Sequence, residues 1–154
     1  MQGNPEVIEY MNVLLGGELM ARDQYFIHAK MYQEWGYEKL YLHTWHEMEE
    51  ESGHAADFIS RILMLGGKPN MKPESLNIGS DVVSMLKADL ALEYSVRTAL
   101  KKGIALCEQH QDYVTRELMV AQLRDTEEDH AHWLEQQLGL IEMMGLPNYL
   151  QSKA

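Results

Sequence analysis

The stretch WHEMEEESGHAADF at residues 45–58 contains ESGH at residues 51–54, and the same Glu-x-x-His pattern returns as EEDH at residues 127–130. On a helix, a spacing of i, i+3 puts the two side chains of each pair on one face, roughly 5–6 Å apart at Cβ. Each helix could then present a carboxylate and an imidazole to the same ion. One such pair is expected by chance in a chain this rich in acids and histidines, whereas two pairs are a stronger signal.

Helical spacing of apolar residues surrounds both pairs, and strand-type alternation is absent. The Gly and Pro residues that interrupt this spacing are grouped at residues 66–79, with weaker breaks near residues 108–112 and 145–147. We therefore predict four long helices and a short fifth one after Pro147. The four long helices are Pro5–Trp35, Glu38–Leu65, Asp81–Gln109 and Asp112–Met144.

The segment Gly66–Gly79 is too long for a tight hairpin, and we expect it to cross the length of the molecule. The other links are short, which favours antiparallel neighbours. The predicted fold is all-α, an antiparallel four-helix bundle with one long crossover, forming a single domain over residues 1–154.

One carboxylate falls on the predicted core-facing stripe of each long helix: Glu18, Glu51, Glu93 and Glu127. Burying an isolated carboxylate costs several kcal/mol or shifts its pKa until it is neutral, and four facing one another would repel. Lys and Arg do not recur on these stripes, so a bound metal is the simpler explanation. A purely structural bundle would leave the four carboxylates without a partner.

The net charge of −11, with Lys and Arg scattered, argues against binding to nucleic acid through the overall field. The acidity fits either solubility or an acidic inner surface that attracts cations. No apolar run approaches the about 18 residues of a membrane-spanning helix, and residues 1–10 do not resemble a secretory signal. The single cysteine, Cys107, excludes a disulfide within the chain, and we expect a cytoplasmic protein with no membrane partner.

Over essentially its whole length the sequence resembles bacterioferritins, which are ferritin-like bundles with two irons held by four Glu and two His residues. The resemblance is carried by GEL at 17–19, DQYF at 23–26, HE at 46–47, ESGHA at 51–55, DLALE at 89–93, EEDH at 127–130 and GLPNYL at 145–150. It implies that Glu18 and His54 bind one iron, that Glu93 and His130 bind the other, and that Glu51 and Glu127 bridge them.

The same resemblance implies roles for four further residues. His46 and Glu50 match a family site for iron on the inner surface, although they could instead be an exposed i, i+4 pair. Tyr25 and Trp133 match aromatic residues that pass electrons near the di-iron centre, although both could instead be packing residues.

The chain departs from the family pattern at Ser52. Bacterioferritins bind haem b between paired subunits through a methionine at this position, and serine is not an axial haem ligand. Two arrangements remain open: a homo-oligomer without haem at that site, or a mixed shell with a second type of subunit that keeps the methionine.

The resemblance implies an iron-storage protein that oxidises Fe²⁺ to Fe³⁺ with O₂ or H₂O₂ and deposits a ferric mineral inside a 24-subunit shell, with a small ferredoxin as a partner for iron release. Because ligation needs a neutral imidazole, iron loading is expected to weaken below about pH 6. Two alternatives stay open, a di-iron peroxidase or oxygenase and a mini-ferritin that protects against oxidative stress. A mini-ferritin would place iron between subunits, whereas the ligand set here lies within one chain.

Overall fold

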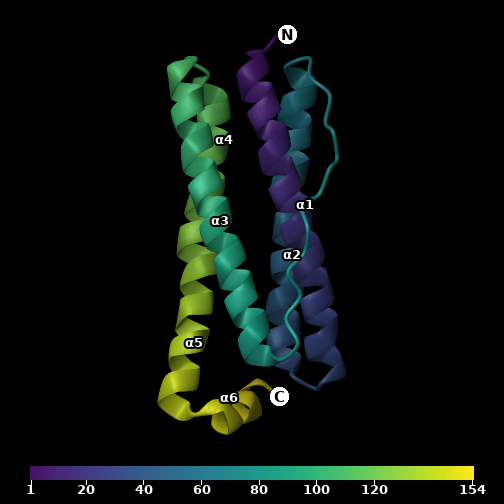
Figure 1. Ribbon diagram of the computed structural model, residues 1–154, viewed down its shortest axis with the longest axis vertical. Coiled ribbons are helices and arrows are strands. Elements are labelled where there is room, and N and C mark those ends of the chain that lie inside the picture. Colours follow the sequence, from purple (N-terminus) through teal and green to yellow (C-terminus); the bar gives the residue numbers. More distant parts are fainter.

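The computed structural model describes residues 1–154 as an elongated bundle of helices with no strand (Figure 1). The long helices α1 and α2 lie side by side, and α3 packs along the helical segments that follow it. The bounds are α1 (Pro5–Glu34), α2 (Glu38–Met64), α3 (Val82–Gln109), α4 (Tyr113–Arg124), η1 (Asp125–Ala131), α5 (His132–Met144) and α6 (Leu146–Lys153). The predicted ferritin-like class, with a short C-terminal helix, is confirmed.

Local sequence explains where the helices begin and end. The side chain of Asn4 accepts hydrogen bonds from the first backbone N–H groups of α1, and Pro5 occupies the first turn. Gly36, with φ of +86°, ends the same helix in a conformation that other residues adopt rarely. Asp81 and Ser84 cap α3 reciprocally, because each side chain accepts from the backbone of the other.

The predicted fourth helix is not a continuous α-helix. Between α4 and α5, the seven residues of η1 form a π-helical turn, with the wider i→i+5 hydrogen bonding. The 3.6-residue periodicity of the sequence did not predict this turn. It changes which residues of the segment face the core, because the extra width shifts the phase of every side chain within it.

The crossover, residues 65–81, runs alongside α1 for most of the length of the bundle, as predicted (Figure 1). Hydrogen bonds tie it to successive turns of α1, so it runs parallel to that helix. At Gly16 the approach is close enough that a Cβ would lie 2.6 Å from the carbonyl oxygen of Lys72. The hydrogen-bonded pairs are Asn12–Lys68, Asn12–Asn70, Gly16–Glu74, Gln24–Asn77 and His28–Gly79.

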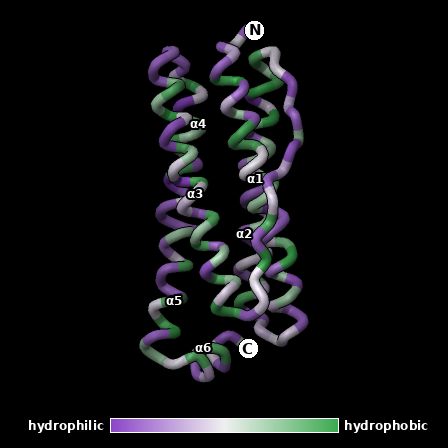
Figure 2. Tube along the Cα trace, in the orientation of Figure 1, coloured by the Kyte–Doolittle hydropathy of each residue, from purple (hydrophilic) through white to green (hydrophobic).

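The core contains two apolar clusters. Polar and apolar residues are interspersed along every helix (Figure 2). The larger cluster lies toward the amino-terminal end of α1 and includes Met11, Leu15 and Phe58. The smaller one lies toward α6 and includes Tyr32 and Tyr149. Along α1, α2, α3 and η1, buried polar residues fall between the two clusters, and this band contains five of the six predicted metal ligands.

Candidate metal centre

Five of the six residues predicted as iron ligands come together in this polar band. They arise from four different elements and all are buried, with at most 7% of any of them exposed: Glu18 on α1, Glu51 and His54 on α2, Glu93 on α3 and His130 on η1. Their ligand atoms form two groups, each with its members within 4.8 Å of one another. Glu18, Glu51 and His54 make the first group, and Glu51, Glu93 and His130 make the second, so Glu51 belongs to both.

Both histidines turn Nδ1 toward these carboxylates. His54 Nδ1 lies 3.6 Å from Glu18 and 3.5 Å from Glu51. His130 Nδ1 lies 2.9 Å from Glu51 and 3.3 Å from Glu93. The two imidazoles thus offer the same nitrogen to a common space that is otherwise lined by carboxylate oxygens.

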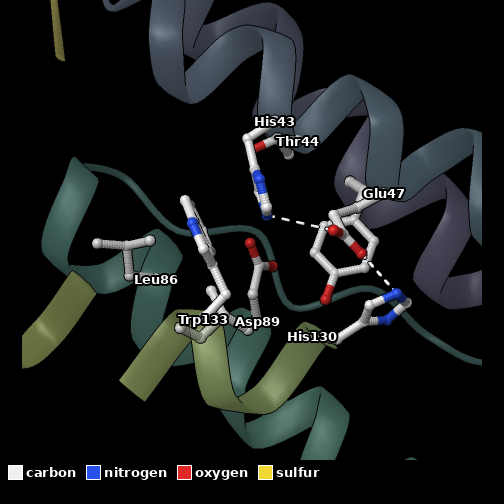
Figure 3. A pocket seen from close by; sticks show the side chains of 9 residues that line it. His43, Thr44, Glu47, Leu86, Asp89, His130 and Trp133 are labelled. Atoms are coloured by element: carbon white, nitrogen blue, oxygen red, sulfur yellow. Dashed lines mark ion pairs between the residues drawn. The ribbon is translucent and has the colours of Figure 1, made fainter. Parts of the chain in front are cut away.

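The other ring nitrogen of each histidine contacts a carboxylate outside the cluster. His54 Nε2 lies 3.1 Å from Asp125. His130 Nε2 lies 2.6 Å from Glu47 and 2.7 Å from Glu50, and the contact with Glu47 is drawn in Figure 3. Histidines that bind metals characteristically hold their second nitrogen in this way, which fixes the orientation of the ring.

Sequence reasoning missed the outer carboxylates Glu47 and Asp125. The signal for Glu47 was its position four residues before Glu51, which places it one turn away on the same face of α2. Asp125 could not have been found in this way, because it meets His54 across the bundle from a segment far away in the chain. Glu47, Glu50 and His130 also form a third group with metal-ligand spacing, through Nε2 of His130.

Several buried polar atoms of the cluster have no hydrogen-bond partner. These are one carboxylate oxygen each of Glu18 and Glu93, and Nδ1 of His54. Leaving such atoms unpaired in a core is costly, so an orphaned set that converges on one space indicates a ligand for it. Carboxylate oxygens with imidazole nitrogens suit first-row divalent metals such as iron, so the donor set fits the predicted cation.

Without a cation, burying these carboxylates together is unfavourable for their ionised forms, as their pKa values show. Burial raises the pKa of Glu18 well above its usual value, and the neighbouring Glu51 raises it further. Burial likewise raises the pKa of Glu93 to about 7. For His54 burial acts in the opposite direction, but the negative charges of the nearby Glu18 and Glu51 prevail and raise its pKa to about 11.

His130 behaves like His54. Burial lowers its pKa, but contacts with Glu47, Glu50 and the cluster outweigh burial and raise the pKa. The acids therefore retain protons on both histidines at neutral pH when no cation is present. Competition between protons and metal extends to higher pH than the limit of about pH 6 expected for an ordinary histidine.

Glu127, the sixth predicted ligand, lies outside the cluster. Its side chain is 39% exposed, and Oε2 lies 3.2 Å from Nε of Arg97 on α3. The expectation that Glu127 lies on the core-facing stripe is wrong, because η1 turns Thr126 into the core, with 1% exposed.

The predicted inner-surface pair, His46 and Glu50, is in contact, with Nε2 of His46 2.9 Å from Oε1 of Glu50. The His46 side chain is 64% exposed, whereas Glu50 is half-buried and also reaches His130. Glu50 therefore links an exposed imidazole to a buried one at the cluster. This link fits both interpretations of His46 and Glu50, as an iron site on the inner surface or as an exposed i, i+4 pair.

The two predicted electron relays lie beside the cluster. The Tyr25 hydroxyl is buried and donates a hydrogen bond to Glu93. Burial raises the pKa of Tyr25 well above its usual value, and the nearby Glu93 adds to this. The Trp133 ring stacks on His43 at 3.6 Å between centroids, and His43 in turn lies 3.2 Å from Glu47 (Figure 3).

At the predicted haem-ligand position, the hydroxyl of Ser52 donates a hydrogen bond to the backbone oxygen of Met48, at 3.1 Å. The hydroxyl is thus engaged within its own helix. Neither residue belongs to the metal-spaced groups.

The chain matches a family model described as a ferritin-like domain over residues 8–144. It is 71% identical over 153 residues to a bacterial ferritin of Neisseria meningitidis serogroup B, and 63% identical over 153 residues to one of Pseudomonas aeruginosa, with 99% of each chain covered in both cases. A bacterioferritin of Mycobacterium bovis is 41% identical over 146 residues, which cover 94% of this chain and 91% of the relative.

Proposed function

Because the chain belongs to the ferritin-like family and is an iron-storage bacterioferritin, we propose that it oxidises Fe²⁺ at a two-iron centre within each subunit, held by Glu18, Glu51, His54, Glu93 and His130. No helix of the structure is both long enough and apolar enough to cross a membrane. We also propose a cytoplasmic setting, which fits the free, buried thiol of Cys107.

One observation carries this proposal: Glu51 is shared by two buried ligand groups. A carboxylate has two oxygens and can contact two cations at once. Glu18 and His54 would complete the surroundings of the first iron, and Glu93 and His130 those of the second. Glu127 is the sixth ligand of the proposal, and it would have to leave Arg97 to take part.

The chemistry asked of these residues is selective stabilisation of charge. Carboxylates are hard ligands that bind Fe³⁺ more tightly than Fe²⁺, so they favour loss of an electron from each iron. Two Fe²⁺ ions then supply two electrons, which reduce O₂ to H₂O₂, or H₂O₂ to two water molecules, with two protons taken up in each case. The histidines release their protons when iron binds, close to where the oxidant is reduced.

Other groups would carry electrons to the centre and iron away from it. We propose that Tyr25, hydrogen-bonded to Glu93, and Trp133, stacked on His43, can supply further electrons to the oxidant. The pair His46 and Glu50 would pass iron to the inner surface, because Glu50 contacts both His46 and His130. A small ferredoxin would deliver the electrons that release stored iron.

Members of this family form multi-subunit shells that bind iron. We propose a 24-subunit shell, either of this chain alone without haem at Ser52, or mixed with a second subunit type that provides a methionine for haem b. An absorption spectrum of the purified particle, with elemental iron analysis, reports mineral and haem together. A particle of one or two chains would instead favour the di-iron peroxidase or oxygenase.

The test of the oxidation site is a comparison of Glu51→Gln with Glu49→Gln. Glu49 lies two residues away on α2 and is exposed, so it is a matched control for charge. Fe²⁺ is added without oxygen, air is admitted, and ferric absorbance in the near ultraviolet is followed. We expect the Glu49 variant to behave like the wild type and the Glu51 variant to lose the fast phase. Equal rates in all three proteins would contradict the proposal.

A further inference from the structure

Glu127 and Arg97 form an ion pair at the surface, although the sequence predicts Glu127 as a metal ligand. Nε of Arg97 lies 3.2 Å from Oε2 of Glu127, and the two side chains are 42% and 39% exposed. Three residues further along η1, the side chain of His130 is fully buried in the cluster. Two residues that should share one helix face therefore point to different surroundings.

The π-helical turn explains this separation. In an α-helix, residues i and i+3 are about 60° apart around the axis. The wider turn of η1 needs more residues to complete a circle, so Glu127 falls further from His130. Asp125, the first residue of η1, lies 3.1 Å from Nε2 of His54. Rewinding the segment as an α-helix would rotate Glu127 toward the buried cluster.

Charge decides which position Glu127 takes. Without cations, a further carboxylate in the cluster would lie beside Glu18, Glu51 and Glu93, which are already buried and mutually repulsive. Outside the cluster, Arg97 offers Glu127 a positive partner instead. Two divalent cations in the cluster would reverse this balance, because they bring four positive charges and take oxygen ligands.

The surroundings leave room for this exchange. Arg97 and Glu127 line an open groove together with Tyr94, Ala131 and Glu135. Glu127 is therefore not locked into its pair by packing. Glu135 offers Arg97 a second carboxylate in the same groove after Glu127 leaves.

We propose that Arg97 is a positioning residue that holds Glu127 outside the metal centre, and that divalent cations draw Glu127 in by rewinding residues 125–131. This inference rests on the proposed function, because it needs a two-cation site beside Glu127. Arg97 and the cations compete for one carboxylate. Cation binding must therefore break this one ion pair before the ligand set is complete.

The test is a titration with Co²⁺, whose visible absorption reports binding without oxidation, on Arg97→Gln, Glu127→Gln and the double variant. The matched control is Arg116→Gln, because Arg116 makes a similar exposed pair with Glu108 at 2.8 Å. Releasing a half-exposed ion pair should tighten Co²⁺ binding roughly two- to fivefold in Arg97→Gln. We expect no tightening in Arg116→Gln, and none from removing Arg97 in the Glu127→Gln background.

The double variant distinguishes competition between Arg97 and the cations for Glu127 from a general effect of the positive charge of Arg97. If losing Arg97 tightens binding equally with and without Glu127, Arg97 acts only by repelling cations, and the inference is wrong. The inference is also wrong if Arg97→Gln binds Co²⁺ like the wild type. If the wild type itself binds no Co²⁺ in the bundle, the proposed function fails as well, so the two failures are distinguishable.

Hydrogen exchange provides a second readout that does not depend on activity. Redox-inert Zn²⁺ should change the exchange of backbone amides in residues 125–131 of the wild type, because their hydrogen bonds change partners on rewinding. The change should be lost in Glu127→Gln, which keeps the other five ligands. Unchanged exchange in the wild type with Zn²⁺ bound would overturn the inference.

Discussion

Replacing Glu93 with glutamine should stabilise the chelator-treated protein while removing part of its metal site. Glu93 is fully buried, and burial raises its pKa from 4.5 to about 7. At pH 8 the side chain is ionised in both the folded and the unfolded state. The buried charge destabilises the folded state. The difference between the two pKa values corresponds to about 3 kcal/mol.

The sign follows from proton linkage. A carboxyl whose pKa is raised on folding binds its proton more tightly in the folded state, so the wild type loses stability as pH rises from about 4.5 to about 7. Glutamine has no such titration and keeps an oxygen acceptor for the Tyr25 hydroxyl. Some stabilisation of protonated His130 is lost, so we expect a net gain of about 1–3 kcal/mol at pH 8.

The assay is thermal unfolding followed by circular dichroism at equal protein concentration, with chelator, at pH 4, 6 and 8. For a chain of this size, Tm should rise by roughly 2–4 °C for each kcal/mol gained. The gain should be present at pH 8 and absent at pH 4, and Glu117→Gln, an exposed substitution, should show neither effect. If Glu93→Gln is no more stable than the wild type at pH 8, or its stability varies with pH as before, the reasoning about buried charge is refuted.

Three further outcomes are expected. Glu18→Gln should bind one Co²⁺ in place of two, and Glu51→Gln should bind none, because only Glu51 belongs to both ligand groups. The number of ions bound is measured by calorimetry, and equal losses in the two variants would contradict the shared role of Glu51. Zn²⁺ binding at pH 7 should release about two protons, one from each histidine. The pKa of His54 is raised to about 11, the pKa of His130 is also raised, and the metal must displace both protons. Calorimetry in buffers of different ionisation enthalpy measures this release. Affinity should therefore still increase above pH 7, and a plateau from pH 6 upward would show that the histidines are neutral. Gln24→Leu should destabilise the protein by about 1–3 kcal/mol and speed proteolysis of the crossover, because the backbone N–H of Asn77 loses its acceptor, Oε1 of Gln24. An unchanged cleavage rate would argue against this contact as an anchor of the crossover.

The helices and three of the four carboxylates could be predicted because both depend on local periodicity. Caps, glycines and apolar spacing act within a few residues, so the bounds of α1, α2 and α3 differ from the predicted ones by one residue. Glu18, Glu51 and Glu93 lie on regular α-helices, where i±3 and i±4 spacing determines the buried face. The same rule failed for Glu127, because its segment is not an α-helix.

The network around the ligands could not be predicted, because it joins residues far apart in the chain. Asp125 meets His54, and Gln24 and His28 meet Asp89, which also lies in the band of buried polar residues. His28 and Gln24 showed no distinctive spacing in the sequence. Their role depends on the crossover, whose backbone they bind at Asn77 and Gly79.

The sequence alone therefore determined an all-helical bundle with a long crossover, and a set of acids and histidines that need a cation. These follow from helix periodicity and from the cost of burying charge, which are properties of the residues themselves. Only the tertiary structure decided which carboxylate is shared, which nitrogen of each histidine faces the cluster, and that Glu127 lies on Arg97. The physical reason is that the π-helical turn has no periodic signal in the sequence. The packing of η1 against its neighbours decides which of its residues face the core.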